Sequence, residues 1–341
     1  MEWRAVLAAS GSFAFLRVAE DCWVCGAGPF ERRAHPPASG IAFYVNDFSL
    51  ASPEPWLIPA RSWQERTIAA GATAPLSISW RNLMRGGFED CYEEIIAGIR
   101  AGLLHKAVLV LAERGHLVEG TPEAIIARTL AASAAPFGWA YGFAQADDGF
   151  AGMTPECLFT LCGKRLHTMA LAGTAKPAEQ VDFQADPKEI REHQLVVDSL
   201  RSKLDPFGDV RQGPREILNV GDLLHFITRF QMDASELDIE SALRLLHPTP
   251  AIGVLPATPE NRARLLSWRD RLGTPGQFGA PFGVKWHGGF HAVVTIRGIS
   301  WKNGDLFLPA GCGIVEGSQL EREWRELALK RDWVKRALSL A

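Results

Sequence analysis

The feature that most constrains the fold is an uninterrupted apolar run, Ala107 to Ala112, in the first third of the chain. Because its residues do not alternate between apolar and polar, the run predicts a strand that is buried on both faces. Lys106 stands at the head of this strand. A lysine in that place is either an end residue whose ammonium reaches water along its own apolar stem, or a buried amine that is kept neutral and basic.

Length and charge narrow the class of protein. The chain has 341 residues, 47% of them hydrophobic, which suits one large domain or two ordinary ones. Its 36 basic and 39 acidic side chains leave a net charge of −3 without a long basic block, so no nucleic-acid partner is expected. The apolar run near the start, Ala5 to Leu16, is too short and too broken to span a membrane. We expect a cytoplasmic monomer without membrane segments.

The cysteines form no regular framework. The 6 positions are Cys22, Cys25, Cys91, Cys157, Cys162 and Cys312. Cys22 and Cys25 have the spacing of a metal or redox pair, but no second pair or histidine accompanies them. Reduced and mostly buried thiols, as in a cytoplasmic protein, are the better interpretation.

A single carboxylate, Glu156, opens an otherwise apolar predicted strand that continues to Leu161. A bare charge is costly to bury, so this side chain is expected to be either paired or protonated. Burial that raises the pKa of a carboxyl group would suit a general acid.

Two predicted helices carry the same pair of acidic residues at i and i+3. The pairs are Glu189 with Glu192 and Glu323 with Glu326. On either helix alone the spacing fits a solvated face as well as it fits a ligand pair. Facing each other, the two pairs would offer the oxygen ligands that Mg²⁺ prefers.

The order of the motifs resembles the chorismate-utilising enzymes, a family that includes anthranilate, aminodeoxychorismate, isochorismate and salicylate synthases. From Lys106 to Lys330 the chain reads K-A-V-L-V-L-A, T-P-E-x-L-F, A-L-A-G-T, D-P-K-E-x-x-E-H-x-x-V-V-D, L-H-P-T-P-A-x-G, a strand ending in Arg297, and A-G-x-G-I-V-x-x-S-x-x-x-x-E-W-x-E-x-x-x-K. The resemblance implies an α+β fold, a single large domain with two antiparallel β-sheets layered with helices. Residues 88–341 would form the chorismate-binding catalytic region, and residues 1–87 a short, variable N-terminal part of the same domain.

The resemblance also implies a role for each matching residue. Lys106 matches the lysine that activates water for attack on the ring, and Glu156 matches the acid that protonates the leaving hydroxyl. The Mg²⁺ ligands match Glu192 and Glu326, and waters bound to the metal would be held by Glu189 and Glu323. The groups around the substrate match Gly173, Thr174, His225, Arg297, Gly311, Gly313 and Lys330.

Local signatures are similar to those of the isochorismate synthase branch, in which water adds at C2 of chorismate and the C4 hydroxyl leaves. Water as the nucleophile requires no glutaminase subunit. Phe278 replaces a common pocket tyrosine, and Val254 replaces the second glycine of the usual turn. A salicylate synthase, an aminodeoxychorismate-type synthase and a non-catalytic chorismate binder stay open as alternatives. Both menaquinone and siderophore biosynthesis stay open as pathways.

Overall fold

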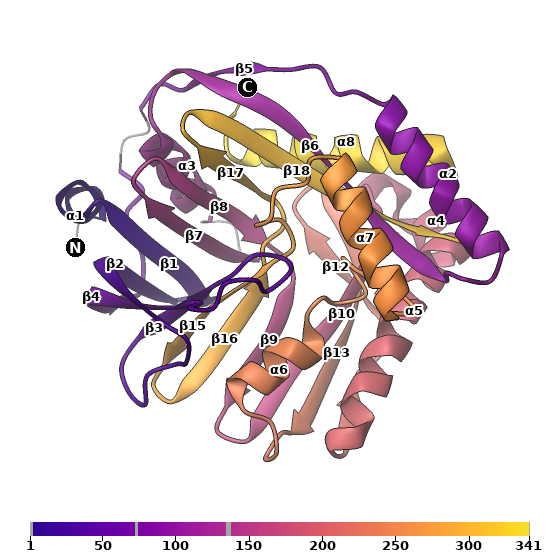
Figure 1. Cartoon of the computed structure of the whole chain (residues 1–341), viewed down its shortest axis with the longest axis horizontal. Coiled ribbons are helices and arrows are strands. Elements are labelled where there is room, and N and C mark those ends of the chain that lie inside the picture. The colour runs from indigo at the N-terminus through magenta and orange to yellow at the C-terminus, as the bar shows by residue number, and fades with distance from the viewer. Residues whose placement is uncertain (1–2, 72–73, 134–137, 341) are drawn as a thin grey trace.

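The computed structural model describes residues 3–71, 74–133 and 138–340 (Figure 1). Within these ranges the helices are α1 (Trp3–Ser10), α2 (Gly86–Arg100), α3 (Pro122–Ala132), α4 (Gln180–Ala185), α5 (Pro187–Leu204), α6 (Ile239–Leu246), α7 (Pro259–Arg271) and α8 (Leu320–Ala337). Short 3₁₀ turns lie at Pro177–Glu179 and Asp205–Phe207. None of the helices in these ranges has the length and apolar character needed to cross a membrane.

The strands make up the rest of the regular structure. They are β1 (Ser12–Ala19), β2 (Cys22–Arg33), β3 (Ala42–Val45), β4 (Trp56–Glu65), β5 (Ser77–Trp80), β6 (Lys106–Glu119), β7 (Trp139–Gln145), β8 (Asp148–Thr154), β9 (Cys157–Cys162), β10 (Arg165–Ala175), β11 (Val210–Gln212), β12 (Glu216–Val220), β13 (Leu223–Asp233), β14 (Val254–Leu255), β15 (Pro281–Trp286), β16 (Gly289–Val294), β17 (Gly298–Lys302) and β18 (Asp305–Val315).

Hydrogen bonds join these strands into one 18-stranded network in which every described pairing is antiparallel. Neighbour by neighbour it runs β5-β6-β18-β17-β8-β7-β1-β2-β4-β3-β15-β16-β9-β10-β13. The network folds back on itself, because Phe150 of β8 packs edge-on against Phe282 of β15 with 5.5 Å between ring centroids. The α+β class is thereby confirmed. The two expected sheets are the two halves of this network, joined through β2 and β4.

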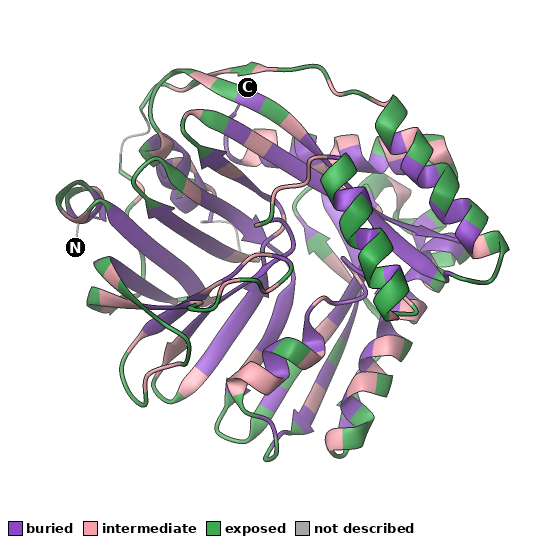
Figure 2. Ribbon diagram, viewed as in Figure 1, coloured by how far each residue is buried: buried purple, intermediate pink, exposed green. Residues whose placement is uncertain are grey.

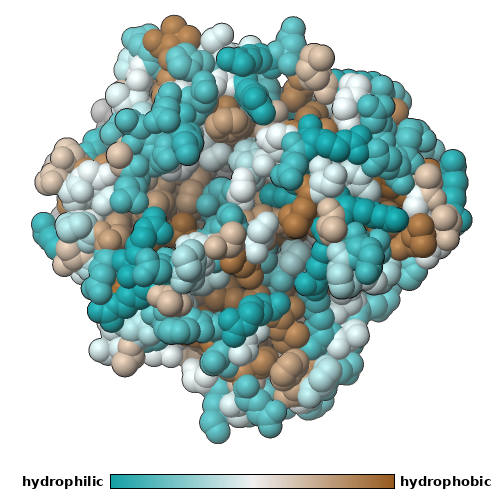
Figure 3. Space-filling view, viewed as in Figure 1, coloured by the Kyte–Doolittle hydropathy of each residue, from teal (hydrophilic) through white to brown (hydrophobic). Residues whose placement is uncertain are grey.

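Helices cover the outer faces of the two halves. In Figure 1, α2, α5, α6 and α7 lie at the right and lower side, and α1 and α3 lie at the opposite side. Side chains of α1 and α3 form one core with the strands beneath them, those of α2, α5, α6 and α7 form another, and α8 contributes side chains to both. Figure 2 shows the result as buried strands and helices that are exposed on their outer faces. Hydrophilic side chains cover most of the face in Figure 3, and hydrophobic ones show mainly in its hollows.

The apolar run that opened the sequence lies in β6, which β18 accompanies over eleven paired positions. Its two faces are both buried, with Ala107 and Leu109 on one face and Val108 and Val110 on the other. The first pair packs in a core with helices, and the second pair packs against Phe278. The register places Gly313 opposite Val108 and Gly311 opposite Val110. The apolar run of β6 and the glycines of β18 therefore lie side by side in one pair of hydrogen-bonded strands.

The packing between the two halves generates the first prediction. Phe282 is fully buried and its ring contacts those of Phe43, Tyr141 and Phe150. We expect Phe282→Ala to lower the free energy of unfolding by about 3–5 kcal/mol, since it removes a large buried side chain and leaves a cavity. Urea unfolding measures the loss. Leu103→Ala, at a half-exposed side chain, is the control and should change stability by less than about 0.5 kcal/mol. Equal effects would contradict face-to-face packing.

Candidate active site

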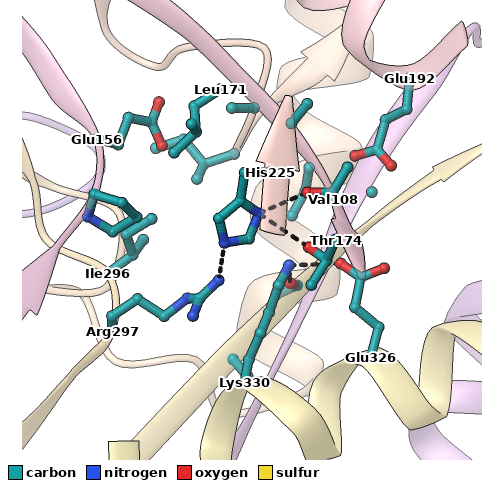
Figure 4. Close-up of a pocket in the computed structure, with 18 of the residues that line it drawn as sticks. Val108, Glu156, Leu171, Thr174, Glu192, His225, Ile296, Arg297, Glu326 and Lys330 are labelled. Atoms are coloured by element: carbon teal, nitrogen blue, oxygen red, sulfur yellow. Dashed lines mark hydrogen bonds and ion pairs between the residues drawn. The ribbon is translucent and has the colours of Figure 1, made fainter. Parts of the chain in front are cut away.

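A cavity with about 630 Å³ of empty space, its open mouth included, lies between β6, β10, β13, β18, α5 and α8 (Figure 4). This is the size range of small-molecule sites. Ten of the residues singled out in the sequence line it, namely Glu156, Gly173, Thr174, Glu192, His225, Arg297, Gly311, Gly313, Glu326 and Lys330. Three others do not. Lys106 is fully buried behind Glu192, and Glu189 and Glu323 line a neighbouring cavity.

Glu156 lies at the left of Figure 4, above Arg297 and across the cavity from Glu192 and Glu326. Its side chain is 2% exposed, and its Oε1 accepts a hydrogen bond from Thr249 Oγ1 at 2.8 Å. Burial raises the pKa of Glu156 to about 7, although the bond from Thr249 and the charges of Lys106 and Lys330 act in the opposite direction. A carboxyl group with that pKa carries its proton in about half of the molecules at neutral pH, and the protonated form can donate it.

Arg297 and His225 form a hydrogen-bonded pair at the floor of the cavity. His225 Nδ1 lies 2.6 Å from the carbonyl oxygen of Gly173, and Nε2 lies 2.9 Å from Nη2 of Arg297. A carbonyl only accepts, so Nδ1 carries the proton and Nε2 accepts from the guanidinium. Burial, with Arg297 beside it, lowers the pKa of His225 well below its ordinary value and keeps the ring neutral.

The bond to His225 uses Nη2 of Arg297 and leaves the other terminal nitrogen of the guanidinium available. Its Nη1 is buried and has no hydrogen-bond partner among the described residues. Burial lowers the pKa of Arg297 to about 10, which still leaves the guanidinium charged at neutral pH. A buried, charged and unpaired donor that borders a cavity is suited to receive a carboxylate.

Lys330 reaches the same cavity from α8. Its Nζ donates to the carbonyl oxygen of Gly311 at 2.7 Å and to Oε1 of Glu326 at 2.6 Å. The carbonyl of Gly311, rather than an N–H, thus faces this lysine. Glu326 and Lys330 lie one turn apart on the helix, which explains why one side chain orients the other.

Gly313 makes room for the pair formed by Lys106 and Glu192. Lys106 Nζ donates to Glu192 Oε1 at 3.0 Å, and both side chains are buried. A Cβ atom at Gly313 would overlap this carboxylate and would lie 3.0 Å from Cε of Lys106. Burial opposes ionisation of Glu192, but Lys106 and Lys188 lower its pKa to about 2. Position 313 therefore requires glycine, because the carboxylate of Glu192 lies too close to the backbone to leave room for a side chain.

Four carboxylates surround a cation that sequence reasoning left without a role. Lys188 Nζ lies 3.1 Å from Glu189 Oε1, 3.1 Å from Glu192 Oε2, 3.3 Å from Glu323 Oε1 and 3.9 Å from Glu326 Oε2. Both helices begin beside this cluster, so their N-terminal N–H groups also favour the negative charge. The paired E-x-x-E spacings do face each other, as the sequence analysis considered.

The oxygen atoms of this cluster fit a hard cation. Burial raises the pKa values of Glu189 and Glu323, and Glu323 Oε2 is buried with no partner in the described part of the chain. As the side chains stand, however, no three Asp, Glu, His or Cys residues in the described ranges converge as a metal-binding group. The donor chemistry suits Mg²⁺, while the place between the donors is taken by an ammonium.

Apolar side chains close the rest of the cavity. Two polar residues that contact the site, Thr249 and Lys188, were given no role from the sequence. Phe278 packs against Val108 and Val110 and presents no hydroxyl to the cavity. Val254 lies outside the cavity lining, in β14 opposite Ala107, where its side chain belongs to the core. Thr249 belongs to the motif L-H-P-T-P-A-x-G, which was recognised in the sequence. Its contact with Glu156 could not be predicted, because only the fold brings the two motifs together.

Residues 62–339 match the sequence model of a family described as chorismate binding enzyme. The chain belongs to this family. It is 30% identical over 272 residues to the salicylate biosynthesis isochorismate synthase of Pseudomonas aeruginosa, covering 75% of this chain and 55% of that protein. It is 28% identical over 220 residues to anthranilate synthase component 1 of the same organism, covering 60% and 44%. The matches thus span about half the length of these relatives.

The structure of this chorismate binding family member resembles that of the menaquinone-specific isochorismate synthase from Escherichia coli. The TM-score is 0.81 at 21% identity, and the likeness covers 99% of this chain and 91% of the other. At that identity the likeness establishes a shared fold, and it confirms the α+β domain expected from the sequence.

The close approach at Gly313 can be tested by stability. We expect Gly313→Ala to lower the free energy of unfolding by roughly 1–3 kcal/mol, because the added methyl group overlaps Glu192 and displaces it from Lys106. Chemical denaturation measures the change. Gly86→Ala, where a Cβ would meet no atom within 4 Å, serves as the matched control. A Gly313→Ala protein as stable as the wild type would show that Glu192 does not lie where described.

Proposed function

We propose that the chain is a Mg²⁺-dependent isochorismate synthase that converts chorismate to isochorismate. The observation that carries the proposal is the asymmetry of the cavity. Glu156, a carboxyl group whose pKa burial raises, lies at one side, while the carboxylates and ammonium groups of α5, α8 and β6 lie at the other. This is the arrangement needed to protonate a leaving hydroxyl while a carboxylate-bearing ring is held in place.

The substrate's two carboxylates require cations, because the protein as a whole is slightly acidic. Arg297 offers its unpaired Nη1, and Lys330 offers an ammonium that is only partly exposed. Glu192 and Glu326 would hold Mg²⁺, with Glu189 and Glu323 behind them. When bound there, Mg²⁺ would bind the ring carboxylate and stabilise the charge that spreads onto it as the C4 hydroxyl leaves.

The proton transfers fall to two residues. Lys106 would take a proton from the water whose oxygen forms the new bond at C2. The ring double bonds shift, the bond from C4 to its hydroxyl breaks, and Glu156 gives its proton to that hydroxyl, which leaves as water. Lys106 can act as a base only after its ammonium has lost a proton and Glu192, which now accepts from its Nζ at 3.0 Å, has turned away.

Several finer expectations belong to the same proposal. Water as the nucleophile needs no glutaminase subunit, and the chain is proposed to act as a cytoplasmic monomer. The product could supply either menaquinone or siderophore biosynthesis. The structural neighbour named as menaquinone-specific favours the first pathway, and the relative named for salicylate biosynthesis keeps a route to salicylate open.

Product analysis tests the reaction directly. Chorismate and Mg²⁺ should give isochorismate by chromatography, and Lys106→Met should lower turnover by roughly 10²–10⁴-fold, because it removes the base but keeps an apolar stem of similar length. Lys302→Met, at an exposed lysine, is the control and should keep wild-type turnover.

Each other product would replace the proposal with one of its alternatives. Salicylate with an equal amount of pyruvate would indicate a salicylate synthase. An aminated product formed with ammonium would indicate an amine-adding synthase. Tight chorismate binding without any product would indicate a binding protein.

The hydrogen bond between Thr249 and Glu156 generates a prediction on pH. A general acid must be protonated, so kcat/KM should fall as the pH rises through the pKa of Glu156, about 7. Thr249→Val removes a bond that stabilises the carboxylate, so this alkaline limb should move upward by about one pH unit. Thr168→Val, which removes a hydroxyl bonded to the carbonyl of Leu158, should leave the limb in place. A limb that Thr249→Val leaves unmoved would contradict Glu156 as the acid.

A further inference from the structure

The ammonium of Lys188 occupies the space between the four glutamates of α5 and α8. Its side chain is only 7% exposed, and all four carboxylates lie within 3.9 Å of Nζ. Burial alone would lower the pKa of Lys188, but these carboxylates hold it well above the ordinary value. The lysine is thus a buried cation that neutralises part of the negative charge of the acidic cluster.

The position of Lys188 in its helix makes this burial unusual. It is the second residue of α5, and its backbone N–H donates to the capping carboxylate of Asp186. A cation beside a helix N-terminus is disfavoured by the helix dipole, and a long lysine side chain at a helix start normally extends into water. The four carboxylates therefore account for its inward orientation.

We propose that Lys188 and a divalent cation compete for one position, so that Mg²⁺ binds only when the ammonium withdraws. This inference rests on the proposed function for the identity of the cation. The same carboxylate oxygens that contact Nζ would have to ligate the metal, and Mg²⁺ requires its ligands at about 2.0–2.1 Å. An ammonium and a divalent ion cannot share that space, because they repel each other at such short range.

The structure provides a place for the displaced side chain. A second cavity, with about 740 Å³ of empty space including its mouth, is lined by Lys188, Glu189, Glu323 and Glu326. The lining of the substrate cavity does not include Lys188, so this second cavity is its route outward. Glu179 and Asp186 border it in ion pairs with Arg325 and Arg322, and Asp182 borders it as the carboxylate that can accept the ammonium.

The exchange also balances charge. With Lys188 inside, the four carboxylates face three ammonium groups, those of Lys106, Lys188 and Lys330. Removing Lys188 without replacement would leave the cluster with an excess of buried negative charge, which is strongly unfavourable. A divalent ion in its place restores neutrality. Lys188 therefore lets the protein fold without metal and weakens the affinity for metal.

Metal binding by a matched pair of variants tests the exchange. Calorimetric titration with Mg²⁺ alone should give a Kd at least tenfold lower for Lys188→Met than for the wild type. Lys330→Met removes a cation that contacts Glu326 from the other side without entering the cluster, and it should change the Kd clearly less. Equal effects of the two variants, or no change with Lys188→Met, would overturn the proposal.

A second measurement uses the wild-type protein, in case the variant does not fold without metal. Reductive methylation followed by peptide mass analysis should label Lys188 faster in the presence of Mg²⁺ than in its absence, because the ammonium moves into the open cavity. Lys106, which is fully buried, should stay protected, and Lys302 should be labelled equally in both conditions. Slower or unchanged labelling of Lys188 with Mg²⁺ would contradict the exchange.

These results are separable from those of the product assay. Isochorismate formed by a protein whose Mg²⁺ affinity is insensitive to Lys188→Met would leave the proposed function standing and refute the exchange. Tighter Mg²⁺ binding by Lys188→Met in a protein that makes no isochorismate would support the exchange and refute the proposed function.

Discussion

The burial of four carboxylates between α5 and α8 is the constraint on which the rest of the site depends. Buried carboxylates repel one another and lose hydration, so each must be neutralised by a nearby cation or by protonation. Lys106 from β6, Lys188 from α5 and Lys330 from α8 supply the cations. The long ladder between β6 and β18 brings Lys106 to this place, and Gly313 leaves the space in which it meets Glu192.

At the opposite side of the cavity, the carboxyl group of Glu156 is not neutralised by a neighbouring cation in the described part of the chain. Glu156 has no cation within ion-pair distance among the described residues, and a single hydroxyl, that of Thr249, bonds to it. Burial consequently raises its pKa to about 7. The cavity thus separates Glu156, whose pKa burial raises, from Glu192, whose pKa is lowered by the ammonium groups of Lys106 and Lys188. Such a separation is how one site can hold both an acid and a base at neutral pH.

The sequence predicted most residues of the cavity lining because its motifs lie at the ends of strands and helices. Glu156 at a strand start, the two E-x-x-E pairs and the glycines of β18 were recognisable from spacing and order. The ten cavity-lining residues were assembled from seven separate segments, which only the fold brings together. The family resemblance, rather than periodicity, supplied that long-range information.

What the sequence left out has physical reasons. Lys188 stands next to Glu189 at a helix start, and this pattern normally indicates a solvated ion pair. Its inward orientation depends on Glu323 and Glu326, more than a hundred residues later in the chain. The joining of the two expected sheets through β2 and β4 depends on long-range pairing in the N-terminal region, where the motifs gave no guidance.

A crystal structure with Mn²⁺ in place of Mg²⁺ tests the central claim most directly. The account predicts one anomalous peak among Glu189, Glu192, Glu323 and Glu326, at the position that the ammonium of Lys188 now occupies, with this side chain turned into the neighbouring cavity. A peak elsewhere in the protein, or Mn²⁺ bound while Lys188 keeps its contacts with the four carboxylates, would contradict it.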